Sequence, residues 1–260
     1  GVSSFVRAQY ETFPYPRWNN VLSPYANEPL MQPFKNRPLD MLIAGCGTGA
    51  EAASIASGFP TSTVLAVDLS TASLSYGIQR SRELGIDNID FRHGDILKLG
   101  TIDKKFDYVA SSGVLHHMED PMAGWRVITS LLKDDGIMRI ALYSRKAREH
   151  IINIRNLIEK DGYENDLAGM RKFRSQAKSI LDEKAYDRIT TVSDYYKASE
   201  CRDLLFHVQE HQYDLPEIES ALDELGLAFI KMSARPAVAH AFQQETGKSP
   251  EVASLQDWHE

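Results

Sequence analysis

Short apolar runs alternate with amphipathic stretches in the first half of the chain. Apolar runs predict strands at residues 39–44, 63–67, 89–92, 106–110 and 137–143. Between them, helical patterns lie at residues 50–57, 71–84 and 121–132, and a turn is expected at Asp134-Asp135-Gly136. Apolar strands separated by helices are typical of a parallel sheet that is covered on both faces. We therefore expect an α/β fold with a Rossmann-like doubly wound sheet.

The alternation stops after the fifth predicted strand. Residues 145–205 have helical patterns with little strand character, which predicts a helical insertion at this point. A further helix is expected at residues 215–225, and the apolar run at residues 227–232 predicts one more strand. The tail is polar and interrupted by proline. The expected organisation is a sheet domain with one insertion: residues 39–144, 145–205 and 206–260.

The first 38 residues are rich in proline and aromatic side chains. Prolines at this density exclude a long helix beyond about Tyr10. We expect residues 1–38 to form an N-terminal strap, which covers apolar surface or closes as a lid over a ligand.

Net charge and the lengths of the apolar runs argue against nucleic acid and membranes as partners. The chain has 260 residues and a net charge of −7, and an acidic surface repels phosphate backbones, so nucleic acid is not an expected partner. No apolar run approaches the roughly 20 residues that span a bilayer, and the chain does not open with a signal-peptide pattern. Cys46 and Cys201 do not suggest a disulfide framework. We expect a soluble cytoplasmic protein without a membrane partner.

A glycine-rich segment, Gly45-Cys46-Gly47-Thr48-Gly49, lies between the first predicted strand and the first predicted helix. Glycines let a backbone turn tightly and approach a ligand closely. The N–H groups and the positive end of the following helix then face that ligand. Taken alone, this pattern also fits a dinucleotide-binding loop.

Acidic residues follow the next two strands. Asp68 ends the second strand, where a carboxylate can accept both hydroxyls of a ribose. The alternative for Asp68 is a helix N-cap, a role equally open to Ser70. Asp95 follows the third strand, where a carboxylate suits the exocyclic amine of adenine, and the alternative for it is a turn residue.

Small residues and paired histidines follow the fourth strand. Ser112 and Gly113 leave room for a ligand in the crevice where such sheets bind. His116 and His117 are candidate catalytic bases because imidazole titrates near physiological pH, and packing or capping is the alternative. His207, Tyr195 and Tyr196 are weaker candidates, for which helix packing is favoured. No metal site is predicted, since histidines and cysteines are scattered and adjacent histidines are poorly spaced for chelation.

Together, these four sites resemble the class I S-adenosylmethionine-dependent methyltransferases over residues 39–143, with weaker likeness at residues 215–232. The resemblance implies S-adenosylmethionine as the cofactor. It implies that the glycine loop holds the methionine part, that Asp68 with Leu69 holds the ribose, and that Asp95 with Ile96 contacts adenine. The segment from Ser112 to His116 would line the methyl-transfer site.

The sequence departs from that family at one position. An acidic residue usually stands two positions before the first glycine, and here that residue is Ile43. Arg17 would pair with the methionine carboxylate when the strap closes. The segments Gln9-Tyr10-Glu11, Tyr15-Pro16-Arg17-Trp18 and Asp203-Leu204-Leu205-Phe206-His207 also look similar to bacterial methyltransferases that can be fused to tetratricopeptide repeats. That likeness implies a domain cut from, or related to, a larger chain.

The expected activity is methyl transfer to an O, N or C atom of a small molecule or a protein side chain. One alternative is a nicotinamide-dependent oxidoreductase, which shares the glycine loop and Asp68 but would need a catalytic Tyr-Lys or Cys-His pair. Another is a non-catalytic S-adenosylmethionine-binding module, which the Ile43 departure favours. Residues 145–205 are expected to cap the acceptor site, and their mixed charges indicate neither the acceptor nor the oligomeric state.

Overall fold

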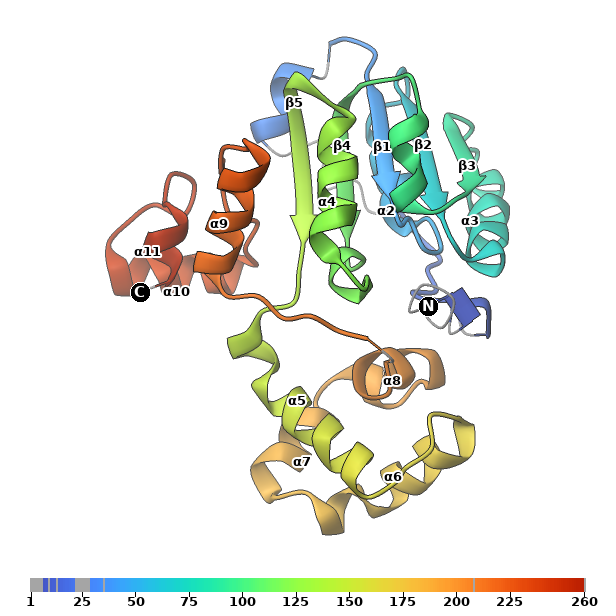
Figure 1. The fold of residues 1–260 in the computed structure, drawn as a ribbon, viewed down its shortest axis with the longest axis vertical. Coiled ribbons are helices and arrows are strands. Elements are labelled where there is room, and N and C mark those ends of the chain that lie inside the picture. The colour runs from blue at the N-terminus through green and yellow to red at the C-terminus, as the bar shows by residue number, and fades with distance from the viewer. Residues whose placement is uncertain are drawn as a thin grey trace.

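Five parallel strands form the sheet at the centre of the protein (Figure 1). The computed structural model describes residues 7–8, 10–12, 14–21, 29–34, 36–207 and 209–259. The strands lie in the order β3-β2-β1-β4-β5, with the bounds Asp40–Ala44 (β1), Thr63–Asp68 (β2), Ile89–His93 (β3), Phe106–Ser112 (β4) and Leu132–Ala141 (β5). Because β1 pairs with both β2 and β4, the strand order reverses there, which is the point where such sheets bind ligands. The predicted Rossmann-like fold is confirmed.

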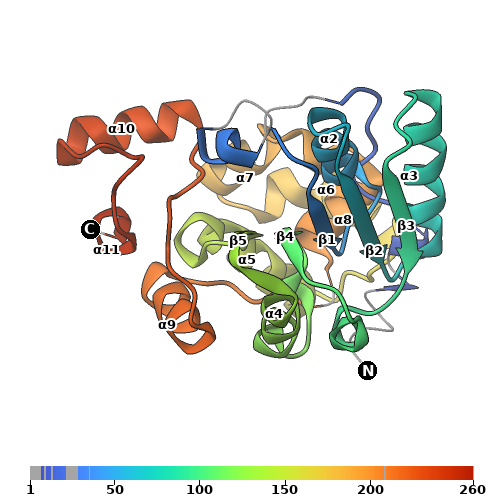
Figure 2. The same ribbon diagram turned by 90° about the horizontal axis from the view of Figure 1, so that it is seen from above.

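Helices cover both faces of this sheet (Figure 2). On one face lie α2 (Ala50–Gly58) and α3 (Thr71–Glu83), and on the other lie the 3-10 helix η3 (Ile96–Thr101), α4 (Pro121–Ser130) and α9 (Leu215–Leu225). Successive residues of a strand point to opposite faces, so Met41 and Ile43 pack in the first layer while Leu42 and Ala44 pack in the second. Both layers bury apolar side chains, which explains the continuous apolar run of β1.

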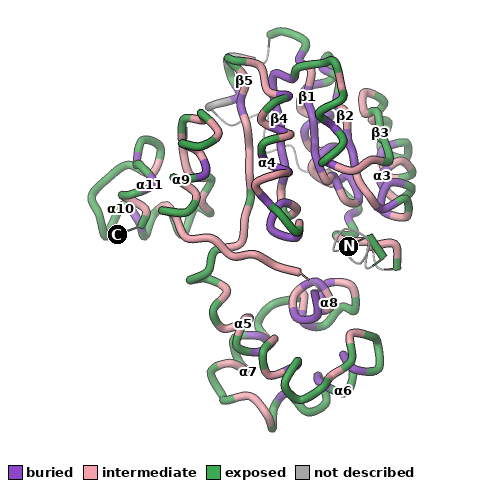
Figure 3. Tube along the Cα trace, viewed as in Figure 1, coloured by how far each residue is buried: buried purple, intermediate pink, exposed green. Residues whose placement is uncertain are grey.

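A separate helical block follows β5. It consists of α5 (Arg145–Lys160), α6 (Leu167–Ile180), α7 (Glu183–Thr190), the 3-10 helix η5 (Ser193–Tyr195) and α8 (Ala198–Leu205). The block has its own buried core, built around Ile154, Phe173 and Ile189 (Figure 3). It lies beyond the carboxyl ends of the strands (Figure 1). Among the described residues, no helix combines the length and the apolar character that a membrane crossing requires.

Side-chain caps explain where most helices begin. The residue before each of α3, α4, α5, α6, α7 and α9 is Ser or Asp, and its side chain accepts a backbone N–H of the first turn. The capping residues are Ser70, Asp120, Ser144, Asp166, Asp182 and Asp214.

The fifth strand begins earlier than the sequence predicts. The expected turn at residues 134–136 lies inside β5, where the register with β4 shifts from the pair Phe106–Leu132 to the pair Tyr108–Ile137. The extra residues are accommodated as an irregularity of the bulge type, so the polar stretch does not end the strand.

The prediction of a strand at residues 227–232 is wrong. This described segment runs from α9 toward α10 (Pro236–Thr246) without strand pairing. Leu227 and Phe229 are half-buried while Ala228 and Ile230 are exposed, so the period-two pattern is real. A strand also needs a partner for its hydrogen bonds, and sequence periodicity does not report that partner. The tail forms two helices that the sequence did not predict, α10 and α11 (Leu255–His259).

Candidate active site

The glycine-rich loop connects β1 to α2 at the carboxyl edge of the sheet. Gly45, Gly47 and Gly49 have backbone φ angles of 78°, 53° and 79°, a region that residues with a Cβ rarely adopt. At Gly45, a Cβ would also lie 2.5 Å from both Cγ atoms of Val114. The N–H of Gly45 donates to the carbonyl of Val67 at 2.8 Å. The loop is therefore held against the end of β2 in a conformation that needs its glycines.

Cys46 lies within this loop as a buried free cysteine. Burial raises the pKa of its thiol well above the ordinary value. A thiol that stays protonated is a poor nucleophile, so Cys46 fits a packing role in the loop better than covalent chemistry.

Asp68, at the end of β2, supports the loop directly. Its carboxylate accepts the N–H of Gly47 at 2.7 Å and the N–H of Ser70 at 2.8 Å. Burial raises the pKa of Asp68, and these two hydrogen bonds oppose the increase. The N-cap of α3 is Ser70, whose hydroxyl accepts the N–H of Ser73. Asp68 is therefore not the capping residue, and its ribose contact, with Leu69 beside it, stays a prediction.

The segments after β3 and β4 reach the same edge. Asp95 caps η3 by accepting the N–H of Leu97 at 3.0 Å, which is the turn role that the sequence left open for it, and Ile96 is buried. Ser112 accepts a hydrogen bond from Arg139 at 3.2 Å. Gly113 is exposed with a φ of 74°. No contact with a ligand is tested for these residues, so their predicted roles stay predictions.

The described part of the N-terminal strap lies across the glycine loop. Thr48 donates its hydroxyl to the carbonyl of Pro16, and the indole N–H of Trp18 donates to the carbonyl of Thr48 at 2.9 Å. The hydroxyl of Tyr76, on α3, bonds both the N–H and the carbonyl of Trp18. Arg17 lies between these contacts and is exposed. Of the predicted strap, residues 1–6, 9, 13, 22–28 and 35 lie outside the described residues.

The paired histidines form the 3-10 helix η4 (Leu115–His117), just after β4. The Nδ1 atom of His117 lies 2.7 Å from the carbonyl oxygen of Gln209. A carbonyl only accepts, so Nδ1 carries the proton and Nε2 keeps a lone pair when the ring is neutral. Burial lowers the pKa of His117, which keeps the ring neutral at physiological pH. His117 thus has the form that a general base requires.

His116 is a weaker candidate for that role. It is fully buried, and neither ring nitrogen has a hydrogen-bond partner among the described residues. Burial lowers its pKa to about 2. Its ring packs on that of Tyr143, with centroids 3.9 Å apart and planes tilted by 30°. Burial lowers the pKa of both rings, but only His117 has a ring nitrogen held by a hydrogen bond, so His117 is the better placed of the two.

Residues from distant parts of the chain complete this cluster. Asp203, on α8, accepts a hydrogen bond from the Tyr10 hydroxyl at 2.6 Å. His207 stacks on His117 with centroids 3.6 Å apart and lies beside the same hydroxyl, 3.5 Å from its Nε2. The segment that follows, residues 209–213, returns to the sheet, where Tyr213 donates its N–H to the carbonyl of Tyr143. Strap, sheet edge and helical block therefore meet at Asp203.

Ligand atoms of His117, Asp203 and His207 lie within 4.8 Å of one another, a spacing close enough to consider a metal ion. The two imidazole rings, however, are stacked with only 17° between their planes. An imidazole binds a metal along the lone pair in its own plane, and the lone pairs of stacked rings run side by side rather than converging. The arrangement suits hydrogen bonding and proton transfer better than chelation.

Sequence reasoning missed Tyr10, Asp203 and Gln209. The signal available for Asp203 was an acid next to the apolar run Leu204-Leu205-Phe206. His207 does join the cluster, although packing was favoured for it. Tyr195 packs in the core of the helical block and Tyr196 is exposed.

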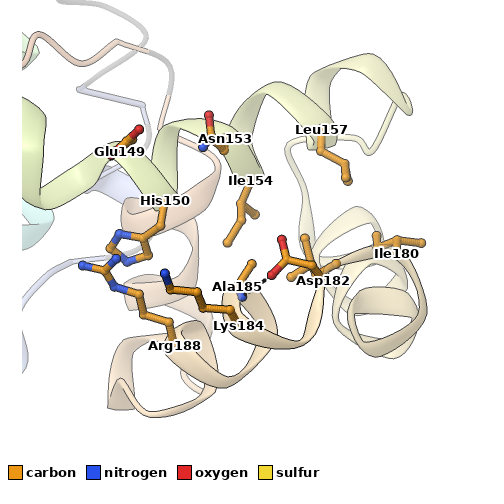
Figure 4. A pocket seen from close by; sticks show the side chains of 11 residues that line it. Glu149, His150, Asn153, Ile154, Leu157, Ile180, Asp182, Lys184, Ala185 and Arg188 are labelled. Atoms are coloured by element: carbon orange, nitrogen blue, oxygen red, sulfur yellow. Dashed lines mark hydrogen bonds between the residues drawn. The ribbon is translucent and has the colours of Figure 1, made fainter.

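Two cavities lie in or beside the helical block. One, of about 310 Å³, lies between α5 and α7 and is lined by His150, Asp182 and Arg188 (Figure 4). The other, of about 420 Å³, is lined by Arg155, Phe206, His207 and Glu210. Only the second touches the cluster, because His207 lines it and also contacts His117.

Comparison with known proteins shows which family this chain belongs to. Residues 36–217 match the model of a methyltransferase domain family, which is more than half of the chain. The chain belongs to this methyltransferase family. It is an S-adenosylmethionine-dependent methyltransferase domain, and S-adenosylmethionine is its cofactor.

Two relatives and one solved structure illustrate the likeness. An uncharacterized protein of Synechococcus sp. is 29% identical over 258 residues, which cover 90% of this chain and 61% of the relative. Trans-aconitate 2-methyltransferase of Deinococcus radiodurans is 28% identical and covers 58% of this chain and 56% of the relative. The structure of PKMT2 from Rickettsia typhi in complex with AdoHcy superimposes with a TM-score of 0.62 at 21% identity, over 89% of this chain and 50% of that one. The methyltransferase domain thus spans about half to three fifths of these proteins.

Proposed function

We propose that this domain transfers the methyl group of S-adenosylmethionine to an O, N or C atom of a small molecule or a protein side chain. The acceptor would bind between the strap, the carboxyl ends of β4 and β5, and the helical block at residues 145–205, which serves as an acceptor cap. The observation that carries the proposal is the glycine loop, held by Asp68 at the point where the strand order reverses.

The residues of the loop edge fit this cofactor. A Cβ would lie 2.5 Å from the side chain of Val114 at Gly45 and 2.8 Å from the side chain of Phe91 at Gly49, so glycine lets the loop that would hold the methionine part pack closely on its neighbours. In this assignment the segment Gly45-Cys46-Gly47-Thr48-Gly49 holds the methionine part, Asp68 and Leu69 hold the ribose, and Asp95 and Ile96 contact adenine. Ser112 and Gly113 line the space beside the methyl group.

The charged ends of the methionine part need other partners. Ile43 is buried within β1 and offers no carboxylate for the ammonium group. Arg17 is exposed beside the loop that Pro16 and Trp18 contact, and it is our proposed partner for the carboxylate.

When bound, the cofactor supplies an electrophilic methyl group with a neutral thioether as its leaving group. The helical block and the sheet edge position the acceptor, and positioning can supply much of the acceleration. His117 takes the acceptor's proton on Nε2 while Gln209 holds its Nδ1–H. The strap, fixed to the loop by Trp18, excludes water from the reacting atoms.

Calorimetry with S-adenosylhomocysteine and S-adenosylmethionine tests the proposal. Both should bind the folded protein, and Asp68→Asn should weaken binding by about 10- to 100-fold, because hydrogen bonds to a charged group contribute roughly 1.5–3 kcal/mol. Asp87→Asn, an exposed acid in the loop between α3 and β3, is the matched control and should change nothing. If the folded protein binds neither compound, the proposal is wrong, and NADH binding in their place would favour the oxidoreductase.

A further inference from the structure

Asp203 is a buried carboxylate that lacks a cationic partner. Its exposed fraction is 6%, and among the described residues no Lys, Arg or His⁺ forms an ion pair with it. Burial raises the pKa of Asp203, and His117, the hydrogen bond from Tyr10 and the more distant Arg148 oppose the increase, while Glu210, which binds Arg148, adds to it. Buried charges are costly and are normally paired. An unpaired carboxylate at a binding edge therefore requires an explanation beyond packing.

Aromatic side chains lie around this carboxylate. Tyr10 donates to it. Burial raises the pKa of Tyr143 and the charge of Asp203 adds to the increase, and for the pKa of Tyr15 burial is followed by Asp194 and then Asp203. His117 and His207 stack beside it. In such surroundings the carboxylate keeps a strong, poorly screened field. A positively charged ligand group would gain most from that field, and a neutral one would gain little.

Asp203 does not serve to orient the catalytic imidazole. In a dyad of that kind the acid accepts the N–H on the far side of the ring, and here the carbonyl of Gln209 accepts the Nδ1–H of His117. His207 is likewise oriented by the backbone, since its Nδ1 accepts the N–H of Gln209 at 3.2 Å. Both imidazoles have backbone partners, so apart from the hydrogen bond from Tyr10 the carboxylate of Asp203 is left for a ligand.

From these contacts we infer that the methyl acceptor is an amine, and that Asp203 is the residue that binds its ammonium form. The inference rests on the proposed function and names the acceptor class for the same site. A carboxylate acceptor would meet repulsion from Asp203, and an alcohol would leave the buried charge uncompensated.

Methyl transfer to an amine can proceed with Asp203 and His117 alone holding and moving the proton. The ammonium, bound to Asp203, gives one proton to Nε2 of His117 and becomes a neutral amine. The nitrogen lone pair then forms the N–C bond to the methyl carbon while the C–S bond breaks, and its electron pair goes to sulfur. The products are a methylated ammonium, which Asp203 still holds, and a neutral thioether. His117 returns its proton to solvent.

A matched pair of probes tests this inference: butylamine, which is cationic near neutral pH, and butan-1-ol, its neutral counterpart. Binding is measured by calorimetry to the protein saturated with S-adenosylhomocysteine. We expect butylamine to bind at least tenfold more tightly than butan-1-ol. Asp203→Asn should remove at least tenfold of the butylamine affinity and leave butan-1-ol within twofold.

Glu200→Gln is the control variant, because Glu200 is another buried acid on α8 that bonds Ser199 and Lys197. It should bind both probes as the wild type does. Equal affinity of the wild type for the two probes, or butylamine binding that survives Asp203→Asn, would overturn the inference. If Asp203→Asn does not fold, the wild-type comparison of the two probes decides alone. Retained S-adenosylhomocysteine binding in these experiments leaves the proposed function standing, whereas its absence defeats that proposal separately.

Discussion

Replacing Gly45 by alanine tests how the cofactor loop depends on close packing. Two separate costs are expected. A residue with a Cβ at a φ of 78° costs about 1–2 kcal/mol, and a methyl group placed 2.5 Å from the Cγ atoms of Val114 costs about 1–3 kcal/mol as overpacking. Gly45→Ala should therefore lower the free energy of unfolding by about 2–5 kcal/mol and weaken S-adenosylhomocysteine binding.

A second substitution separates the two costs. Val114→Ala removes both Cγ atoms, so the double variant Gly45→Ala/Val114→Ala should recover the overpacking cost and keep the φ cost. Urea unfolding of the wild type, both single variants and the double variant gives the coupling energy, expected at about 1–3 kcal/mol in favour of the double variant. Gly85→Ala is the control for φ alone, because Gly85 has a φ of 68° and nothing within 4 Å of its would-be Cβ. Single-variant effects that add to within about 0.5 kcal/mol would refute the packing argument.

Two further predictions concern the sheet and the strap. Burial raises the pKa of Asp107, but its hydrogen bonds, first that of Lys133, outweigh this and lower it to about 2. Since its folded-state pKa lies below the unfolded value, Asp107→Asn should cost about 2 kcal/mol at pH 7. That difference should fade as the pH falls from about 4 toward 2, and a constant gap in urea unfolding across this range would contradict the explanation. Trp18→Phe removes the N–H that binds the carbonyl of Thr48 and should weaken S-adenosylhomocysteine binding by about fivefold or more, at a cost of roughly 1–3 kcal/mol. Trp258→Phe, in α11, should leave that affinity unchanged.

The sequence predicts where the glycine loop and the strand-end acids lie in the fold, because each of them is local to one strand. The glycines of the loop, Asp68 and Asp95 each lie directly after their own strand, so the strand pattern alone places them at one edge of the sheet. The same locality explains why β1 to β4 are predicted closely. The irregularity in β5 arises from its pairing with β4. Residues 227–232 do not form a strand because no neighbouring strand among the described residues pairs with them. Neither property is encoded in the periodicity of the segment itself.

The cluster of Tyr10, His117, Asp203 and His207 could not be predicted in this way, because its parts are distant in sequence. Tyr10 and Asp203 are separated by 193 residues, and His117 and Gln209 by 92. No helical or strand period relates such positions, and each residue alone has an ordinary structural explanation. Only the returning segment at residues 209–213 brings the helical block back to the histidines.

The two parts of the site come from different parts of the fold. The cofactor edge is built from strand ends, so it is inseparable from the sheet and can be shared across the family. Asp203 and His207 come from the inserted block and its exit, and Tyr10 comes from the strap. These segments can change while the sheet stays intact, since neither contributes a strand. Under the proposed function, acceptor choice is separable from cofactor binding, and the charge of Asp203 is the feature that favours an amine.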